Sequence, residues 1–110
     1  MKKINIDYVQ QINKAFGETL VRDADLKSAE DSKYFVKGKD KEMALWVRGI
    51  VVAHAFSDAN KRTALLVVAE FKKIRNGKAI IRAFTKIADK HIVDLDVIVR
   101  MINNANRRKD

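Results

Sequence analysis

The fold is decided by residues 40–76, which read DKEMALWVRGIVVAHAFSDANKRTALLVVAEFKKIRN. An apolar stripe at helical spacing follows Asp40, which is able to cap a helix, and predicts a buried helix that ends near His54. A second helix begins between Asp58 and Asn60 and is apolar nearly all round until Asn76-Gly77, where a glycine suits a helix C-terminus. We therefore expect two central helices joined by a short polar loop.

The segment before this pair is expected to be partly helical. Apolar residues recur at three- and four-residue spacing from Tyr8 to Phe16, which predicts a first helix that Asn5 or Asp7 is able to cap. A short helix is permitted around residues 24–30. Residues 34–39 combine two aromatic residues with a glycine, which favours an extended flap or a short hairpin over a helix.

The segment after the pair divides into an extended part and a helical part. Residues 78–84 are apolar and branched enough to run extended over the core, and Thr85 is able to cap a short helix that reaches about His91. Asp94 is able to cap a last helix, whose inward positions are Leu95, Ile98, Val99 and Ile102. The chain then ends in a basic tail.

Composition limits the fold class and the location of the protein. The chain has 110 residues with no proline, no cysteine and four glycines, which favours one all-α domain over residues 1–110 and excludes a disulfide scaffold or a thiol nucleophile. Its N-terminus is too polar for a signal peptide, and no apolar run approaches the roughly 20 residues of a membrane span. A cytoplasmic protein without a membrane partner is expected.

The charge of the chain indicates a phosphate-bearing or acidic partner. Lys and Arg number 23 against 14 Asp and Glu, so the formal net charge is +9. Such an excess attracts nucleic acid, nucleotides or an acidic protein, and charge alone does not choose among them.

The loop between the central helices carries the chemical information. His54 closes the first helix, and Asp58, Asn60, Lys61 and Arg62 follow at the start of the second. The unpaired N–H groups and the dipole of a helix N-terminus attract an anion such as a polyphosphate, which the two cations would also contact. Asp58 is suited to hold Mg²⁺ against the same phosphates, and His54 is suited to accept a proton from an attacking hydroxyl. This combination predicts phosphoryl or nucleotidyl transfer.

Each of these residues also has an ordinary structural interpretation. A histidine at a helix end is more often a hydrogen-bonded core residue than a base, and Asp58 is as well suited to cap its helix as to bind a metal. Lys61 and Arg62, taken alone, are typical solvated surface charges, and Phe56 is expected to anchor the loop in the core in either case. The functional interpretation therefore depends on the string as a whole.

Taken as one string, residues 54–63 (HAFSDANKRT) resemble the signature loop of the Fic/Doc family, and most closely its Doc, or death-on-curing, branch. The usual Fic form is His-Pro-Phe-x-Asp/Glu-Gly-Asn-Gly/Lys-Arg. The resemblance covers roughly residues 24–105, and only the loop and its flanking helices are specific. It implies a compact helical bundle in which two central helices present the loop and an upstream flap positions the target segment. Residues 34–39 are the candidate for that flap, and an ordinary packed connection is the alternative for them.

The resemblance also implies a role for each matching residue. His54 would be the general base, Phe56 the anchor of the loop and Asp58 the Mg²⁺ ligand. Asn60 and Arg62 would hold phosphate oxygens of ATP, and Lys61 would add a cation beside them. Ala55 stands where many Fic members have proline. This departure from proline is common in the Doc-like pattern.

Lys61 is the residue that separates the two activities of the family. Members with lysine at this position are Doc-like kinases, which pass the terminal phosphate of ATP to a threonine of elongation factor Tu. Members with glycine are AMP transferases, which transfer the innermost phosphate with its nucleoside. The resemblance thus implies a Doc-like toxin that blocks translation and is held by an antitoxin protein, with a Fic-type AMP transferase as the alternative. A basic helical nucleic-acid-binding domain is a weaker alternative, because the cations are scattered along the sequence and leave the loop's His, Asp and Asn unexplained.

Overall fold

Helices make up the part of the chain that the structure describes. The computed structural model describes residues 4–15, 23–32, 35–52 and 58–109, and no residue in these ranges is in a β-strand. Six α-helices and one π-helical turn follow in the order α1 (Ile6–Ala15), α2 (Asp23–Ser32), α3 (Lys39–Val47), η2 (Arg48–Val52), α4 (Asp58–Phe71), α5 (Gly77–Asp89) and α6 (Leu95–Asn106). The prediction of an all-α fold is confirmed.

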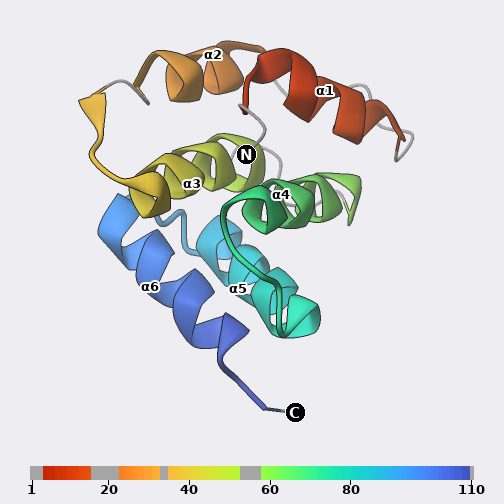
Figure 1. Cartoon of the computed structure of the whole chain (residues 1–110), viewed down its shortest axis with the longest axis vertical. Coiled ribbons are helices and arrows are strands. Elements are labelled where there is room, and N and C mark those ends of the chain that lie inside the picture. Colours follow the sequence, from red (N-terminus) through yellow and green to blue (C-terminus); the bar gives the residue numbers. More distant parts are fainter. Residues whose placement is uncertain (1–3, 16–22, 33–34, 53–57, 110) are drawn as a thin grey trace.

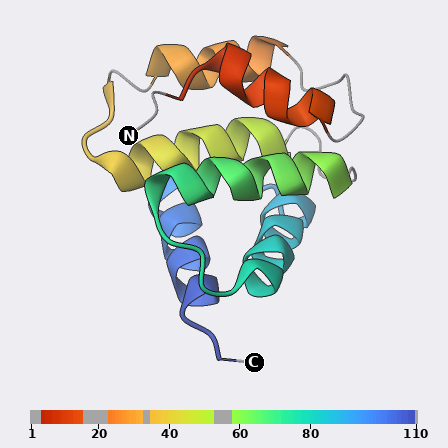
Figure 2. The same ribbon diagram turned by 45° about the vertical axis from the view of Figure 1, so that its right-hand side comes forward.

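The helices pair into three layers (Figure 1). Helices α1 and α2 form one outer layer, α3 with η2 and α4 form the middle layer, and α5 and α6 form the other outer layer, as Figure 2 shows from the side. The middle layer corresponds to the predicted central pair. One end of that layer holds the end of η2 and the start of α4, where the candidate loop joins them.

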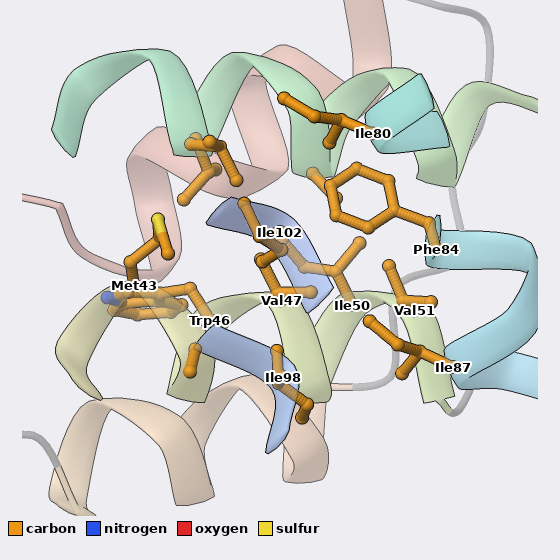
Figure 3. Close-up of a cluster of buried hydrophobic side chains, with 14 of the residues drawn as sticks. Met43, Trp46, Val47, Ile50, Val51, Ile80, Phe84, Ile87, Ile98 and Ile102 are labelled. Carbon is orange, nitrogen blue, oxygen red and sulfur yellow. The ribbon is translucent and has the colours of Figure 1, made fainter. Parts of the chain in front are cut away.

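The core is built mainly on the middle layer. Five consecutive α3 residues, Met43 to Val47, are buried, because the helix is covered on several sides by its neighbours. Figure 3 shows Trp46 and Ile50 among side chains that come from α5 and α6 as well. Helix α4 is less enclosed, since 42% of the Leu66 surface is exposed. The most enclosed central helix is therefore α3.

The start of α3 differs from the sequence prediction. Gly38, with a φ of 92°, is the N-cap, and Asp40 lies in the first turn, where its carboxylate is 3.3 Å from Nζ of Lys72. The prediction that Asp40 caps this helix is therefore wrong. The flap hairpin is also wrong for residues 35–38, which form a non-strand connection that turns into α3 at Gly38; Tyr34 lies outside the described residues. A positive φ is accessible to glycine at little cost, which allows this abrupt start.

The segment after α4 also differs from the prediction. Helix α4 ends at Phe71, and the side chain of Asn76 accepts a hydrogen bond of 3.0 Å from the backbone N–H of Ala79, so Asn76 begins a helix instead of ending one. The expected extended segment 78–84 is helical and belongs to α5. Thr85 lies inside this helix and donates to the carbonyl of Ile81, so its predicted role as a cap is wrong.

The predicted caps of the first and last helices are confirmed where the structure describes them. The Oδ1 of Asn5 accepts from the backbone N–H of Tyr8 at 2.9 Å, and Oδ1 of Asp94 accepts from the N–H of Asp96 at 2.9 Å. The short helix expected around residues 24–30 is present as α2. Of the described helices, none has the length and apolar character needed to cross a membrane.

Candidate functional site

The candidate loop lies between a π-helical turn and the first turn of α4. The chain leaves α3 through η2, residues RGIVV, and resumes as α4 at Asp58. π-helical turns are rare and occur frequently at functional sites. His54 and Phe56 lie outside the described residues, as does the side chain of Asp58, whose backbone opens α4. Their predicted roles as base, anchor and Mg²⁺ ligand stay predictions.

The first turn of α4 is suited to contact an anion. The first N–H groups of an α-helix have no partner within the helix, and the helix dipole adds partial positive charge there. Lys61 ends this turn and Arg62 begins the next, Lys61 half-buried and Arg62 exposed. Neighbouring residues of a helix project about 100° apart, so the two cations point in different directions.

The side chain of Asn60 is fixed by a residue of α1. Asn60 is only 2% exposed, and its Oδ1 accepts a hydrogen bond of 2.7 Å from Nδ2 of Asn13. The same Nδ2 donates to Oγ1 of Thr63 at 3.2 Å. Asn13 and Thr63 are buried as well, so three polar side chains form a buried cluster between α1 and the start of α4. Buried amides need such partners, because an unsatisfied group costs about 1–3 kcal/mol.

This cluster determines which groups of Asn60 can contact an anion. Its Oδ1, which is an acceptor and has no attraction for phosphate oxygen, is directed toward Asn13. Only the N–H donors of Asn60 suit an anion, and its side chain is buried. The hydrogen bond from Asn13 thus orients the amide whose sequence position predicts phosphate binding.

A second hydrogen bond joins α1 to the other end of α4. The hydroxyl of Tyr8 donates to Oε1 of Glu70 at 2.6 Å. Burial, followed by the hydrogen bond to Glu70 and the charge of that carboxylate, raises the pKa of Tyr8 to about 12. Helix α1 is therefore held along α4 at both ends, with Asn13 at the end that carries the candidate loop.

The described residues offer no preformed metal cluster. No group of three His, Cys, Asp or Glu side chains comes together within the described ranges. Mg²⁺ that is bound with a nucleotide typically takes only one or two carboxylates, together with phosphate oxygens and water. A single carboxylate at Asp58 would be sufficient for this kind of site.

The structure thus places three predicted site residues and reveals one that sequence reasoning missed. Asn60, Lys61 and Arg62 are consecutive residues near the start of α4, but only Asn60 enters the buried cluster. Asn13 was not predicted. Its available signal was local: it lies four residues after the buried Val9, so a polar side chain occupies the apolar face of α1.

Comparisons with known proteins do not assign the chain. No protein-family model matches it, and no curated protein and no solved structure matches it either.

Proposed function

We propose that this protein is a nucleotide-dependent phosphotransferase that passes the terminal phosphate of ATP to a Ser or Thr hydroxyl of another protein. The observation that carries the proposal is the string of residues 54–63 at the junction of two central helices, where a base, a carboxylate, an amide and two cations occur within ten residues. The resemblance of this string to the Doc signature supports the same chemistry. The buried amide cluster and the π-helical turn beside the loop are further support, because both are features of a constrained site.

The proposed reaction needs one proton acceptor and one phosphate cradle. A ring nitrogen of His54 accepts the proton of the target hydroxyl, whose oxygen forms a bond to the terminal phosphorus of ATP. The bond between that phosphorus and the bridging oxygen breaks, and ADP leaves with the electron pair. Histidine suits this role because its ordinary pKa of about 6.5 leaves the neutral ring available at neutral pH.

The residues at the start of α4 fit a triphosphate with its metal. N–H groups of the first turn and the side chains of Lys61 and Arg62 are donors or cations, which is the donor set that phosphate oxygens require. Asp58 would hold Mg²⁺, which when bound neutralises charge on the phosphates and orients them. Phe56 would anchor the loop between His54 and Asp58 in the apolar interior.

Lys61 favours transfer of the terminal phosphate over transfer of AMP. A lysine at this position fills space that a glycine would leave for the inner phosphates, and its half-buried side chain occupies the first turn of α4. AMP transfer remains the second candidate activity, since both reactions use the same base and phosphate cradle.

The proposed cellular role is that of a toxin in a toxin–antitoxin pair. A kinase of this type would modify a translation factor similar to elongation factor Tu in the cytoplasm and so stop protein synthesis. The net charge of +9 suits an acidic antitoxin segment as the partner that restrains it.

The test is a transfer assay with ATP labelled in parallel on the terminal and the innermost phosphate, with Mg²⁺ and elongation factor Tu as the acceptor. Label from the terminal phosphate alone is the expected result. Label from the innermost phosphate would make the protein an AMP transferase. No transfer of either label, to the factor or in a whole lysate, would contradict the proposal.

A further inference from the structure

A basic surface lies at the end of the molecule where α4 is joined to α5 and where α6 ends. Six exposed cations line three hollows there and define what we call the basic surface: Arg75, Arg82, Lys86, Arg107, Arg108 and Lys109. None of the described residues that line these hollows is acidic. The hollows adjoin, because Arg108 lines the first and second, and Arg75 and Arg107 line the second and third.

One part of this surface is a groove between α5 and α6. The groove has a volume of about 370 Å³. Alanines of both helices and the half-buried Met101 line it, together with the exposed cations Arg82, Lys86 and Arg108. The second hollow, of about 500 Å³, continues it around the end of α6. An extended ligand that runs from the groove to the C-terminal end of α6 would therefore contact cations along its length.

Asparagine side chains hold the segments of this surface together. The Oδ1 of Asn106 accepts from the backbone N–H of Arg75 at 2.7 Å, and its Nδ2 donates to the carbonyl of Lys73 at 2.9 Å. Asn76 donates to the carbonyl of Arg108 at 3.0 Å. These bonds fix the connection between α4 and α5 against the end of α6, so Arg75 and Arg108, 33 residues apart in the sequence, are held on one surface.

The arrangement differs from ordinary placement of charge at a helix end. A cation near the C-terminus of a helix is favourable by about 0.3–1 kcal/mol, which accounts for Arg107 at the end of α6. That effect does not account for Arg75 in the connection or for Arg82 within α5. Cations from three segments around adjoining hollows whose described lining contains no acidic residue are instead typical of a surface that binds a polyanion.

We propose that the basic surface binds the phosphate backbone of a nucleic acid. Four of its six cations are arginines, whose planar donor fork matches phosphate oxygens. An acidic protein partner would require aromatic or large apolar anchors as well. The exposed large apolar residues of the described chain, Phe35, Leu66 and Val93, lie outside the three hollows, so the surface favours nucleic acid over protein.

This binding goes beyond the proposed transfer reaction and uses a different part of the molecule. The candidate loop precedes α4, whereas the basic surface begins after it, and the 14 residues of α4 span roughly 20 Å. The scatter of cations along the sequence argued against a nucleic-acid partner. Folding removes that argument for these six, because it gathers them around three adjoining hollows of the layer formed by α5 and α6, which Figure 2 shows with the C-terminus.

The test measures binding of a fluorescently labelled single-stranded RNA and, in parallel, a duplex DNA of mixed sequence at several salt concentrations. The test variant is Arg75→Gln/Arg107→Gln/Arg108→Gln, which changes three exposed side chains. The matched control is Lys14→Gln/Lys27→Gln/Lys37→Gln, which removes the same charge from exposed positions outside the basic surface. Helical circular dichroism of both variants is compared with the wild type, and Arg108→Glu alone provides a variant with one exposed change.

The expected result is salt-dependent binding that the test variant weakens at least about tenfold, with the slope of log K against log salt reduced by about 2 for the single strand. The single strand and the duplex distinguish which form of nucleic acid supplies the phosphates. The control variant and His54→Ala should bind within about twofold of the wild type, because charges more than a Debye length of about 10 Å away are screened.

Equal losses in both triple variants, or no binding by the wild type, would overturn the proposal. Equally tight binding of polyglutamate with the same sensitivity would overturn it in favour of an acidic protein partner.

Discussion

The Nδ2 of Asn13 lies 2.7 Å from the Oδ1 of Asn60, and this hydrogen bond joins α1 to the first turn of α4. The two residues are 47 positions apart and both are 2% exposed. The first helix, which the resemblance leaves unmatched, thus contributes a buried contact to the candidate site. We infer that α1 orients the amide of Asn60 and stabilises the start of α4.

Replacing Asn13 by Ala should lower the free energy of unfolding by about 1–3 kcal/mol, because Oδ1 of Asn60 loses its buried partner. Urea unfolding measures this change, with Lys14→Ala on the exposed face of α1 as the control. A double-mutant cycle with Asn60→Ala should give a coupling energy well above zero. Independent effects of the two changes would contradict the inferred contact.

The same variant tests whether Asn13 positions the site. If Asn13 orients Asn60, Asn13→Ala should lower the rate of transfer or raise KM for ATP at a temperature at which the variant is fully folded. If the Asn13→Ala variant is destabilised but keeps the kcat and KM of the wild type, the contact is structural only.

Tyr8 should give the protein a specific loss of stability at high pH. The pKa of Tyr8 is about 12 in the folded protein against an ordinary value of 10.0, so the folded state holds the phenolic proton more tightly. The resulting stabilisation is complete below pH 10.0 and is lost as the pH rises through about 12. Tyr8→Phe should cost about 1 kcal/mol near neutral pH, where it removes the hydrogen bond to Glu70, and less at high pH.

An ultraviolet titration of the tyrosinate checks this prediction directly. The chain has two tyrosines, so Tyr34→Phe leaves Tyr8 as the sole signal. Glu70→Gln should move the pKa of Tyr8 back toward 10.0, since it removes the negative charge. An ordinary pKa for Tyr8 in the folded protein would contradict the contact.

Substitutions at two glycines test the helix boundaries, because one should stabilise the protein and the other should destabilise it. A Cβ on Gly77 would meet Cδ2 of Leu65 at 3.5 Å, an ordinary contact, and Gly77 is the first residue of α5, so Gly77→Ala should stabilise the protein by about 0.4–1 kcal/mol. Gly38 has a φ of 92°, so Gly38→Ala should cost about 1–3 kcal/mol although no atom would obstruct its Cβ. Thermal unfolding of both variants measures the difference. A destabilising Gly77→Ala would instead favour the helix C-terminus that the sequence predicted there.

Lys61 should control which phosphate of ATP is transferred. Lys61→Gly removes the half-buried side chain from the first turn of α4, so the ratio of innermost to terminal label in the acceptor should rise. Lys61→Met, which keeps most of the volume, serves as the control and should lower transfer without changing that ratio. An unchanged ratio in Lys61→Gly would show that the lysine does not set the orientation of the nucleotide.

Local signals explain which parts of the fold were predictable. The caps at Asn5 and Asp94 act within three residues, and the apolar residues Met43, Val47, Ile50 and Val51 recur at helical spacing from α3 into η2, so both were visible in the sequence. Helix α5 was missed because the branched run of residues 78–84 also suits an extended segment. Its buried positions Ala79, Ile80, Phe84 and Ile87 nevertheless follow the helical period, and Asn76 is a good N-cap.

The candidate site was predictable only in part, because its supporting contacts are long-range. The string from His54 to Thr63 identified the start of α4 from neighbouring residues alone. The bond from Asn13 to Asn60 and the one from Tyr8 to Glu70 join positions 47 and 62 residues apart, and no local pattern specifies such partners. The gathering of Arg75 with Arg108 depends on tertiary structure in the same way.

The central claim is that residues 54–63 form a phosphoryl-transfer site, and the most direct measurement compares the wild type with His54→Ala and His91→Ala in the transfer of terminal phosphate from ATP. His91, the other histidine, is exposed beyond the end of α5 and serves as the matched control. Loss of a general base should lower the rate about 10²–10⁴-fold in His54→Ala and leave His91→Ala unchanged. Equal activity of His54→Ala and the wild type, with both folded, would contradict the account.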